Sequence, residues 1–270
     1  MALSLRNVVV VYKQPPARSR RMPARAAQQH LATLEELYQI LQQQGIPFRA
    51  IPMEQLGSLA RADLVITVGG DGTFLATSHY VHRAPMLGIK SIGQPSVGYF
   101  CVATRTTMAR YLRQLVAGKH TPIALARLAV SIGRRRLQEP VLNECLFSHG
   151  SPAAISDYRL CVGRVCEAQR SSGLWVATAA GSSAAIKAAG GTQLPLTATD
   201  LQYLVREPYM HRPYQLLHGV LPPQSILRII SHCAHGTLSI DGAHIQYPVP
   251  EGVVITIRQS QRPLQIYWKR

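Results

Sequence analysis

The chain has 270 residues, of which 47% are hydrophobic and 16% are charged, and its formal net charge at pH 7 is +16. This length allows one large domain or two of ordinary size, each with an apolar core. The apolar runs are far too short to cross a bilayer, and the N-terminal residues show neither a secretory nor a transit-peptide pattern, which predicts a cytoplasmic protein with no membrane partner.

The first half of the sequence alternates between strand and helix patterns. Residues 7–12 are an apolar strand pattern, and residues 26–44 place their leucines on one helical face before Gly45. Further strands are expected at 48–53, 64–68 and 86–90, and further helices from Thr73 and at 107–117. This alternation predicts a parallel sheet with crossover helices, whose ligands would lie at the carboxyl ends of the strands.

The segment VITVGGDGTFLA, residues 65–76, joins one of these strands to a helix. Gly69, Gly70 and Gly72 permit a tight turn, and a helix N-terminus offers free N–H groups to a phosphate. Asp71 would repel that phosphate. A simple phosphate-binding turn would not contain this acid. Its presence is explained if Asp71 binds a metal or takes a proton from a hydroxyl that attacks the phosphate. A tight turn capped locally by Asp71 is the alternative.

After residue 121 the pattern changes to short apolar segments separated by turn signals. Asp241-Gly242 is typical of a two-residue hairpin, and a short helix is expected at 183–189. The sequence therefore predicts an α/β domain over 1–121 and an antiparallel β-sandwich domain over 122–270.

The cysteines do not predict a disulfide framework or a zinc site. There are five, they are scattered, and no CxxC pair occurs, so reduced thiols are expected. The segment HCAH, residues 232–235, has no second pair of ligands, so no metal site is expected there.

The positive charge is spread along the chain rather than gathered in one tract, and aromatic residues make up only 6%. This distribution favours phosphate-bearing ligands over nucleic acid, although a basic surface with no role is the alternative. Lys13 directly follows the first expected strand. It could reach a phosphate or could be an exposed strand end.

Four stretches resemble, in order and spacing, motifs of the NAD kinase family, which belongs to the superfamily that includes diacylglycerol and sphingosine kinases. They are GGDGTFL from Gly69, Asn143-Glu144, SGLWVATAAGSSAAIKAAGG from Ser172, and LSIDG from Leu238. The segment GIKSIGQPSVGYF, residues 88–100, is similar to the mitochondrial-type branch and its bacterial relatives.

The resemblance implies a Rossmann-like N-terminal domain, a β-sandwich C-terminal domain and an active site between them. It implies transfer of a γ-phosphoryl group from ATP, or from inorganic polyphosphate, to the adenosine 2′-hydroxyl of NAD, with Mg²⁺ or another divalent cation. It also implies a homodimer or homotetramer. Asp71 would be the general base or would orient the hydroxyl, and phosphates would be held by Gly69, Gly70, Gly72 and Thr73. NAD would be bound by Asn143, Glu144, Ser172, Thr178, Gly181, Ser182 and Ser183.

The sequence departs from the family pattern at the third motif. Ser172 replaces an acid, Ala179-Ala180 replaces a Pro-Thr pair, and Ala185 replaces a tyrosine. These losses predict weaker acceptor binding. They also keep open a non-catalytic protein that binds dinucleotides or, through its basic charge, nucleic acid. A lipid kinase that uses the same loop is a further alternative, against which the Asn-Glu and Gly-Ser motifs and the lack of an exposed amphipathic helix pattern weigh.

Overall fold

The computed structural model describes residues 3–15, 23–93, 97–209 and 213–269. The chain divides into two compact units, one made of Met1–Ala124 with Leu264–Arg270 and the other of Leu125–Pro263. Residues 94–96, which belong to the segment similar to the mitochondrial-type branch, lie outside the described ranges. Among the described residues, no helix is long and apolar enough to span a membrane.

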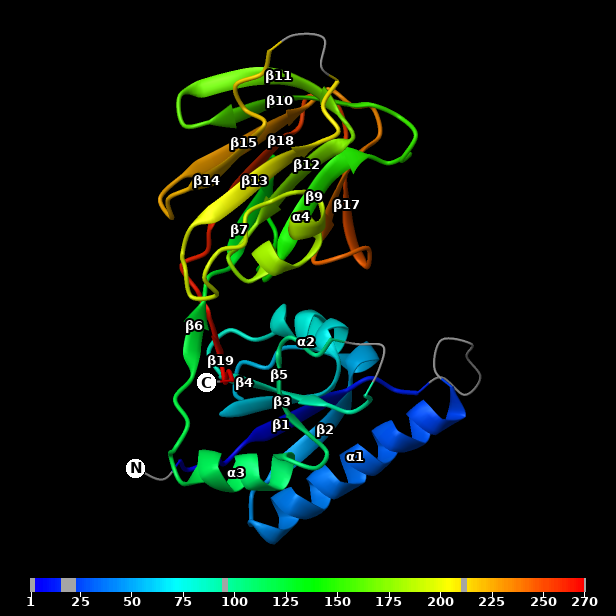
Figure 1. Cartoon of the computed structure of the whole chain (residues 1–270), viewed down its shortest axis with the longest axis vertical. Coiled ribbons are helices and arrows are strands. Elements are labelled where there is room, and N and C mark those ends of the chain that lie inside the picture. Colours follow the sequence, from blue (N-terminus) through cyan, green and yellow to red (C-terminus); the bar gives the residue numbers. More distant parts are fainter. Residues whose placement is uncertain (1–2, 16–22, 94–96, 210–212, 270) are drawn as a thin grey trace. The chain divides into compact units, whose positions relative to one another are not determined.

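The first unit is built on a largely parallel sheet in the order β2-β1-β3-β4-β19-β6, with β5 paired to β4. Figure 1 shows α1 and α3 on one face of this sheet and α2 on the other. The strands are β1 (Val8–Tyr12), β2 (Phe48–Pro52), β3 (Leu64–Gly69), β4 (Met86–Lys90), β5 (Cys101–Thr104), β6 (Ile123–Leu125) and β19 (Leu264–Ile266). The helices are α1 (Ala24–Gln43), the short 3₁₀ turn η1 (Met53–Gln55), α2 (Asp71–Ser78) and α3 (Met108–Val116).

The core of this unit follows from the pattern of its sequence. Leu34, Leu37 and Leu41 lie on one face of α1 and pack on the buried valines of β1 and the apolar residues of β3. Because β1 and β3 are covered on both faces, their residues are continuously apolar rather than alternating. The parallel α/β arrangement predicted for the first half is confirmed.

The last strand of the chain returns to the first unit. Ile266 of β19 pairs in parallel with Met86 of β4, and the amide of Tyr267 donates to the Met86 carbonyl at 2.8 Å. The expected second domain, residues 122–270, therefore extends too far, since β19, Leu264–Ile266, is a strand of the first sheet and belongs to the first unit. A three-residue strand that follows a β-rich region looks, in the sequence, like one more strand of that region. Composition alone therefore did not show that β19 belongs to the first unit.

The second unit contains two six-stranded antiparallel sheets, in the orders β11-β10-β15-β18-β7-β8 and β14-β13-β12-β9-β16-β17. The first sheet contains β7 (Leu128–Ile132), β8 (Arg135–Arg136), β10 (Ser156–Val162), β11 (Val165–Ser171), β15 (Ile226–Ser231) and β18 (Val254–Gln259). The second contains β9 (Glu144–His149), β12 (Gly173–Ala177), β13 (Leu201–Arg206), β14 (His218–Leu221), β16 (Gly236–Ile240) and β17 (Ile245–Val249). The only helical turns described are η2 (Gly181–Ser183) and α4 (Ala185–Ala188).

One apolar core joins the two sheets. Tyr158 and Ile229 of the first sheet lie in the same buried cluster as Phe147 and Leu174 of the second. Alternate residues of each strand face this core, as expected for a sandwich of antiparallel sheets. The predicted β-sandwich is confirmed.

Two local expectations are corrected by the structure. The expectation that all thiols are reduced is wrong for Cys161 and Cys166, which form a disulfide across the β10–β11 hairpin because they are paired in register. The helix expected from Thr73 begins two residues earlier, at Asp71, and Gly70 precedes it as the N-cap residue. A hairpin is present here and Asp241 and Gly242 have positive φ values of 47° and 110°, but its loop is longer than the expected two residues: Ile240 pairs with Ile245, so residues 241–244 form the loop.

Candidate active site

The glycine-rich turn of the first unit joins β3 directly to α2. The carbonyl of Gly70 accepts the amides of Thr73 at 3.1 Å and Phe74 at 3.2 Å, which closes the first helical turn. A Cβ atom at Gly69 would overlap the Thr73 side chain, so this position requires glycine. Amide groups at this helix N-terminus, together with the positive end of the helix dipole, form an arrangement that binds anions.

Asp71 is the first residue of α2, and its side chain is held in place by the chain that follows β4. Its Oδ1 accepts a hydrogen bond from the amide of Phe100 at 2.9 Å. Phe100 is itself fixed, since its ring stacks on that of Phe74 with 4.9 Å between centroids. The carboxylate is partly exposed. The structure thus combines an oriented acid with a turn suited to phosphate.

Two lysines lie at the carboxyl edge of the same sheet. Lys90 ends β4 and is paired in register with Gly69, and its Nζ donates to the Val97 carbonyl at 3.4 Å. Lys13 follows β1, whose last residue pairs with Val68 of β3. Lys90 was not among the site residues expected from the sequence. It lies at the end of an expected strand, and the same kind of position was the reason for proposing Lys13.

A buried histidine supports this edge of the sheet. His30 of α1 is 1% exposed, and its Nδ1 lies 2.8 Å from the Ser91 hydroxyl. The amide of Ser91 donates to the carbonyl of Gly69 at 3.2 Å. Burial lowers the pKa of His30, which favours the neutral ring. His30 thus connects α1, through Ser91, to the glycine turn.

In the second unit, Asn143 and Glu144 are held by a carboxylate from a distant hairpin. Asp241 accepts the amides of Leu142 at 2.8 Å, Asn143 at 2.7 Å and Glu144 at 3.1 Å. In return, the amide of Asp241 donates to the carbonyl of Glu144 at 2.9 Å. The sequence placed Asp241 in a hairpin and in the LSIDG stretch but did not reveal this role.

Asn143 and Glu144 are each only 7% exposed, yet each has a polar side-chain atom that is not used in hydrogen bonding within the described part of the chain. Asn143 Oδ1 and Glu144 Oε2 are buried and have no hydrogen-bond partner within the described residues. Burial, followed by the charge of Asp241, raises the pKa of Glu144 from 4.5 to about 8, so its neutral form is favoured at pH 7. Buried polar atoms without partners are costly and are typical of functional positions.

The segment around Gly181 packs directly against this pair. A Cβ atom at Gly181 would overlap the carbonyl of Asn143, so only glycine fits there. The Thr178 hydroxyl donates to the Leu142 carbonyl at 2.6 Å, and the Ser182 hydroxyl donates to that of Ala179 at 2.6 Å. Thr178 and Ser182 are fully buried, whereas Ser183 is partly exposed and donates to the Ala180 carbonyl at 3.2 Å.

Ser172 and Glu144 line one pocket of the second unit, with a volume of about 660 Å³. The pocket lies on the face of β9, β12 and β16 that points away from the apolar core. Trp175 and Arg206 also line it, and the Arg206 guanidinium lies 5.8 Å from the centre of the Trp175 indole. This volume and this mixture of polar and aromatic groups are suitable for a small organic ligand.

Within the ranges that the structure describes, no group of three His, Cys, Asp or Glu side chains is placed to hold a metal ion.

Comparison with known proteins identifies the family. A model of the ATP-NAD kinase N-terminal domain matches residues 58–120. A rice protein (Oryza sativa subsp. japonica) named probable NADH kinase is 30% identical over 262 residues, which cover 88% of this chain and 81% of that protein. The chain belongs to the NAD kinase family. The family resemblance seen in the four sequence motifs is therefore confirmed. As a member of this family, the chain is a phosphotransferase.

Two further proteins agree with this assignment. An NAD kinase from the archaeon Methanocorpusculum labreanum is 31% identical over 208 residues, which cover 75% of this chain and 72% of that protein. The crystal structure of an NAD kinase from Archaeoglobus fulgidus in complex with ATP has a TM-score of 0.76 with this structure. The two chains are 22% identical, and the match covers 97% of this chain and 93% of that one. At this level of identity, the comparison shows that the two proteins share a fold.

Proposed function

We propose that this NAD kinase family member transfers the γ-phosphoryl group of ATP to the adenosine 2′-hydroxyl of NAD, giving NADP and ADP. The observation that carries the proposal is Asp71, an oriented carboxylate at the start of α2 inside a glycine turn suited to phosphate. An acid at an anion-binding turn is explained by a hydroxyl that must lose its proton as it attacks the phosphate.

In this proposal the first unit binds the phosphate donor. Gly69, Gly70, Gly72 and Thr73 hold phosphate oxygens through the turn, and Lys13 and Lys90 supply positive charge at the same sheet edge. Asp71 accepts the 2′-hydroxyl proton as the oxygen bonds to the γ-phosphorus and the bond to the β-phosphate oxygen breaks. Such positioning and charge stabilisation account for most of the catalysis in phosphoryl transfer.

A divalent cation, with Mg²⁺ the first choice, fits this site through the nucleotide. The described residues contain no cluster that would hold a metal by themselves, and Asp71 is a carboxylate of the type that Mg²⁺ prefers. The cation would therefore be held mainly by donor phosphates, with Asp71 as the protein ligand available at the turn. When bound, it neutralises phosphate charge.

The second unit binds the acceptor in this proposal. Asn143 and Glu144 offer buried polar atoms that no described residue satisfies, which suits hydrogen bonding to hydroxyls and amides of NAD. Ser172 contributes a hydroxyl to the pocket that Glu144 lines. Thr178, Gly181 and Ser182 act by fixing the backbone under Asn143, since their polar groups bond within the protein. Ser183 carries the partly exposed hydroxyl of that segment, which also donates to the Ala180 carbonyl.

We also propose that the protein assembles as a homodimer or homotetramer and that it accepts NADH as well as NAD. The second point rests on the name of the rice relative, a probable NADH kinase. Light scattering after gel filtration would give the mass of the assembly, and a single peak at 29.7 kDa would contradict the first point.

The deciding experiment combines the purified chain with NAD or NADH, Mg²⁺ and either ATP or inorganic polyphosphate. A coupled dehydrogenase specific for NADP reads the product from NAD, and chromatography reads the product from NADH. NADP formation that requires a donor and Mg²⁺ supports the proposal. Phosphorylation of diacylglycerol or sphingosine in place of NAD would establish the lipid kinase alternative, and NAD binding with no product would establish the non-catalytic one.

A further inference from the structure

Four arginines form a diagonal line across the sheet of the second unit that contains β10. They lie on the adjacent strands β11, β10, β15 and β18 in the order Arg170, Arg159, Arg228 and Arg258. From one arginine to the next, the position moves to the adjacent strand and shifts by two residues in the same direction along the sheet. The pairs that fix this register are Asp157–Arg170, Arg159–Ile230 and Arg228–Thr256.

All four side chains point away from the apolar core. Their neighbours along the strands, such as Leu160, Ile229 and Ile257, belong to the core cluster, and successive residues of a strand face opposite sides. The four arginines are exposed. Because diagonal neighbours in an antiparallel sheet lie about 7–8 Å apart, the line is more than 20 Å long, or about three such steps.

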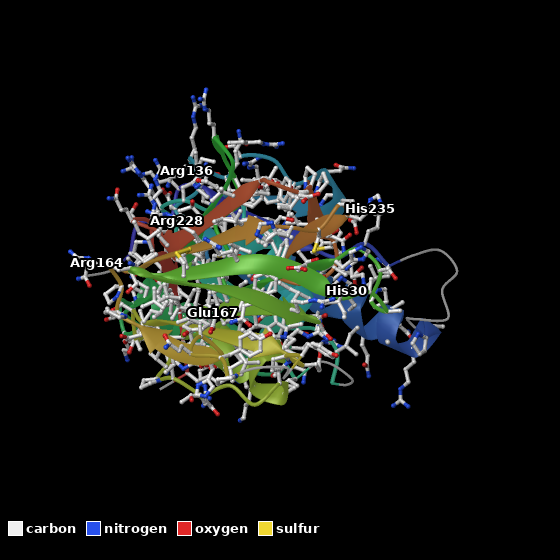
Figure 2. The ribbon with its side chains drawn as sticks, turned by 90° about the horizontal axis from the view of Figure 1, so that it is seen from above. His30, Arg136, Arg164, Glu167, Arg228 and His235 are labelled. Carbon is white, nitrogen blue, oxygen red and sulfur yellow. A yellow bond between two sulfur atoms is a disulfide. The ribbon has the colours of Figure 1, made fainter. Side chains whose placement is uncertain are left out.

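Further positive charge flanks this line. Arg136 of β8 and Arg164 of the β10–β11 turn are exposed, and Figure 2 shows both on the same side of the view as Arg228. Asp157 is the only acid among the outward residues of these six strands, and it lies 3.8 Å from Arg170. Arg159, Arg228 and Arg258 form no ion pair with any residue that the structure describes.

The chemistry of this face selects a phosphate-bearing partner. Its cations are arginines, whose planar guanidinium groups pair with phosphate oxygens through two hydrogen bonds. The outward residues of its strands include no aromatic ring, and Tyr209, from the segment after β13, lies 5.7 Å from the Arg170 guanidinium at one end of the line. One ring at the end of the line does not provide the row of platforms on which proteins stack successive bases of a single strand. A second copy of the same face would be repelled, because the charges have one sign.

We propose that this arginine line is a binding surface for double-stranded nucleic acid, which it contacts through backbone phosphates and without sequence preference. The sequence argument against nucleic acid rested on the lack of a basic tract and on the small share of aromatic residues. The fold brings arginines from four separate strands into one line, which no tract in the sequence could reveal.

The test measures binding of a fluorescently labelled 20-base-pair duplex by anisotropy between 50 and 200 mM salt. Three unpaired arginines predict that log K falls with log[salt] with a slope of about −2.7, which is about a 40-fold loss of affinity over that range. Saturating ATP should leave binding unchanged, because the ATP turn of the proposed function lies in the other unit.

The variant for this test is Arg159→Gln/Arg228→Gln/Arg258→Gln. It should lower duplex affinity at least tenfold at 50 mM salt, abolish most of the salt dependence and leave kinase activity unchanged. The matched control, Arg49→Gln/Arg61→Gln/Arg110→Gln, removes the same charge from exposed positions of the first unit and should bind nearly as the wild type does. Circular dichroism of both variants verifies the fold.

Three results would overturn the proposal. One is equal duplex affinity for the arginine-line variant and the wild type. Another is an equal loss in the control, which would mean that net charge alone is responsible. The third is binding of inorganic polyphosphate or of phosphatidylserine vesicles through these arginines with no binding of the duplex.

Discussion

Asp241 Oδ1 accepts a hydrogen bond from the amide of Asn143 at 2.7 Å, although 98 positions separate the two residues. The same carboxylate accepts the amides of Leu142 and Glu144. The two acceptor residues proposed for NAD are therefore held by the hairpin between β16 and β17. The conformation of the Asn-Glu pair depends on a residue that sequence spacing cannot connect to it.

Replacing Asp241 with asparagine should weaken the acceptor site. Asparagine tolerates the positive φ of this position but has one uncharged acceptor oxygen in place of two charged ones. It can keep weaker bonds from the amides of Asn143 and Glu144, but the Leu142 amide then faces the Nδ2 donor and loses its partner. We expect a loss of about 1–2 kcal/mol in the free energy of unfolding and a several-fold rise in the KM for NAD. Urea unfolding and steady-state kinetics measure the two effects.

Asp63 provides a matched control for that variant. Its Oδ2 accepts the amides of Arg6 at 2.8 Å and Asn7 at 2.9 Å, so it anchors backbone in the same way but in the first unit. Asp63→Asn should leave the KM for NAD unchanged. If the two variants change KM equally, Asp241 has no particular role in the acceptor site.

Asp71→Asn should abolish most turnover while leaving the fold intact. Asparagine Oδ1 can still accept the Phe100 amide, and the residue is partly exposed, so the free energy of unfolding should change little. Loss of a positioned base costs about 10²–10⁴ in rate. Glu35→Gln, an exposed carboxyl on α1, is the control and should retain full activity. Near-normal NADP formation by Asp71→Asn would remove Asp71 from the chemistry.

Burial of Glu144 predicts that stability declines as pH rises. The folded-state pKa of about 8 lies above the ordinary value of 4.5, so between these values the folded chain binds more protons than the unfolded chain. Stability is therefore greatest below about pH 4.5 for this group and falls until the pH passes the folded pKa. Glu144→Gln should remove this part of the decline. Urea unfolding at pH 5, 6, 7 and 8 measures it, and parallel profiles for the two proteins would refute the effect.

Local patterns predicted those parts of the molecule that depend on nearby residues. The apolar run of β3, the leucines of α1 and the Asp241-Gly242 turn each produce their structure through contacts or dihedral preferences of the segment itself. The position of Asp71 beside an anion-binding turn followed in the same way, because strand, glycines and helix are consecutive.

What the sequence did not predict depends on the register in which strands pair, whether the strands are far apart in the chain or consecutive. The return of β19 to β4, the placement of Lys90 beside Gly69 and the disulfide of Cys161 with Cys166 are all set by strand register. A shift of one residue in that register would send each side chain to the other face of its sheet. Composition and motif spacing do not contain this information.

Ser172→Asp should lower the KM for NAD by up to about tenfold with little change in kcat. Ser172 lines the same pocket as Glu144 and Arg206, at the position where the family pattern has an acid. A hydrogen bond to a charged group contributes about 1.5–3 kcal/mol, compared with about 0.5–1.5 kcal/mol for a neutral one, so the restored carboxylate should gain about 1 kcal/mol. Ser172→Asn, similar in size but neutral, is the control and should give a smaller change. Because Glu207 also lines the pocket, the new charge meets some repulsion, which low salt would strengthen. If the KM for NAD stays constant or rises in Ser172→Asp while kcat holds, the serine belongs to an acceptor pocket of different shape, one in which Trp175 and Arg206 leave no place for the family's acid.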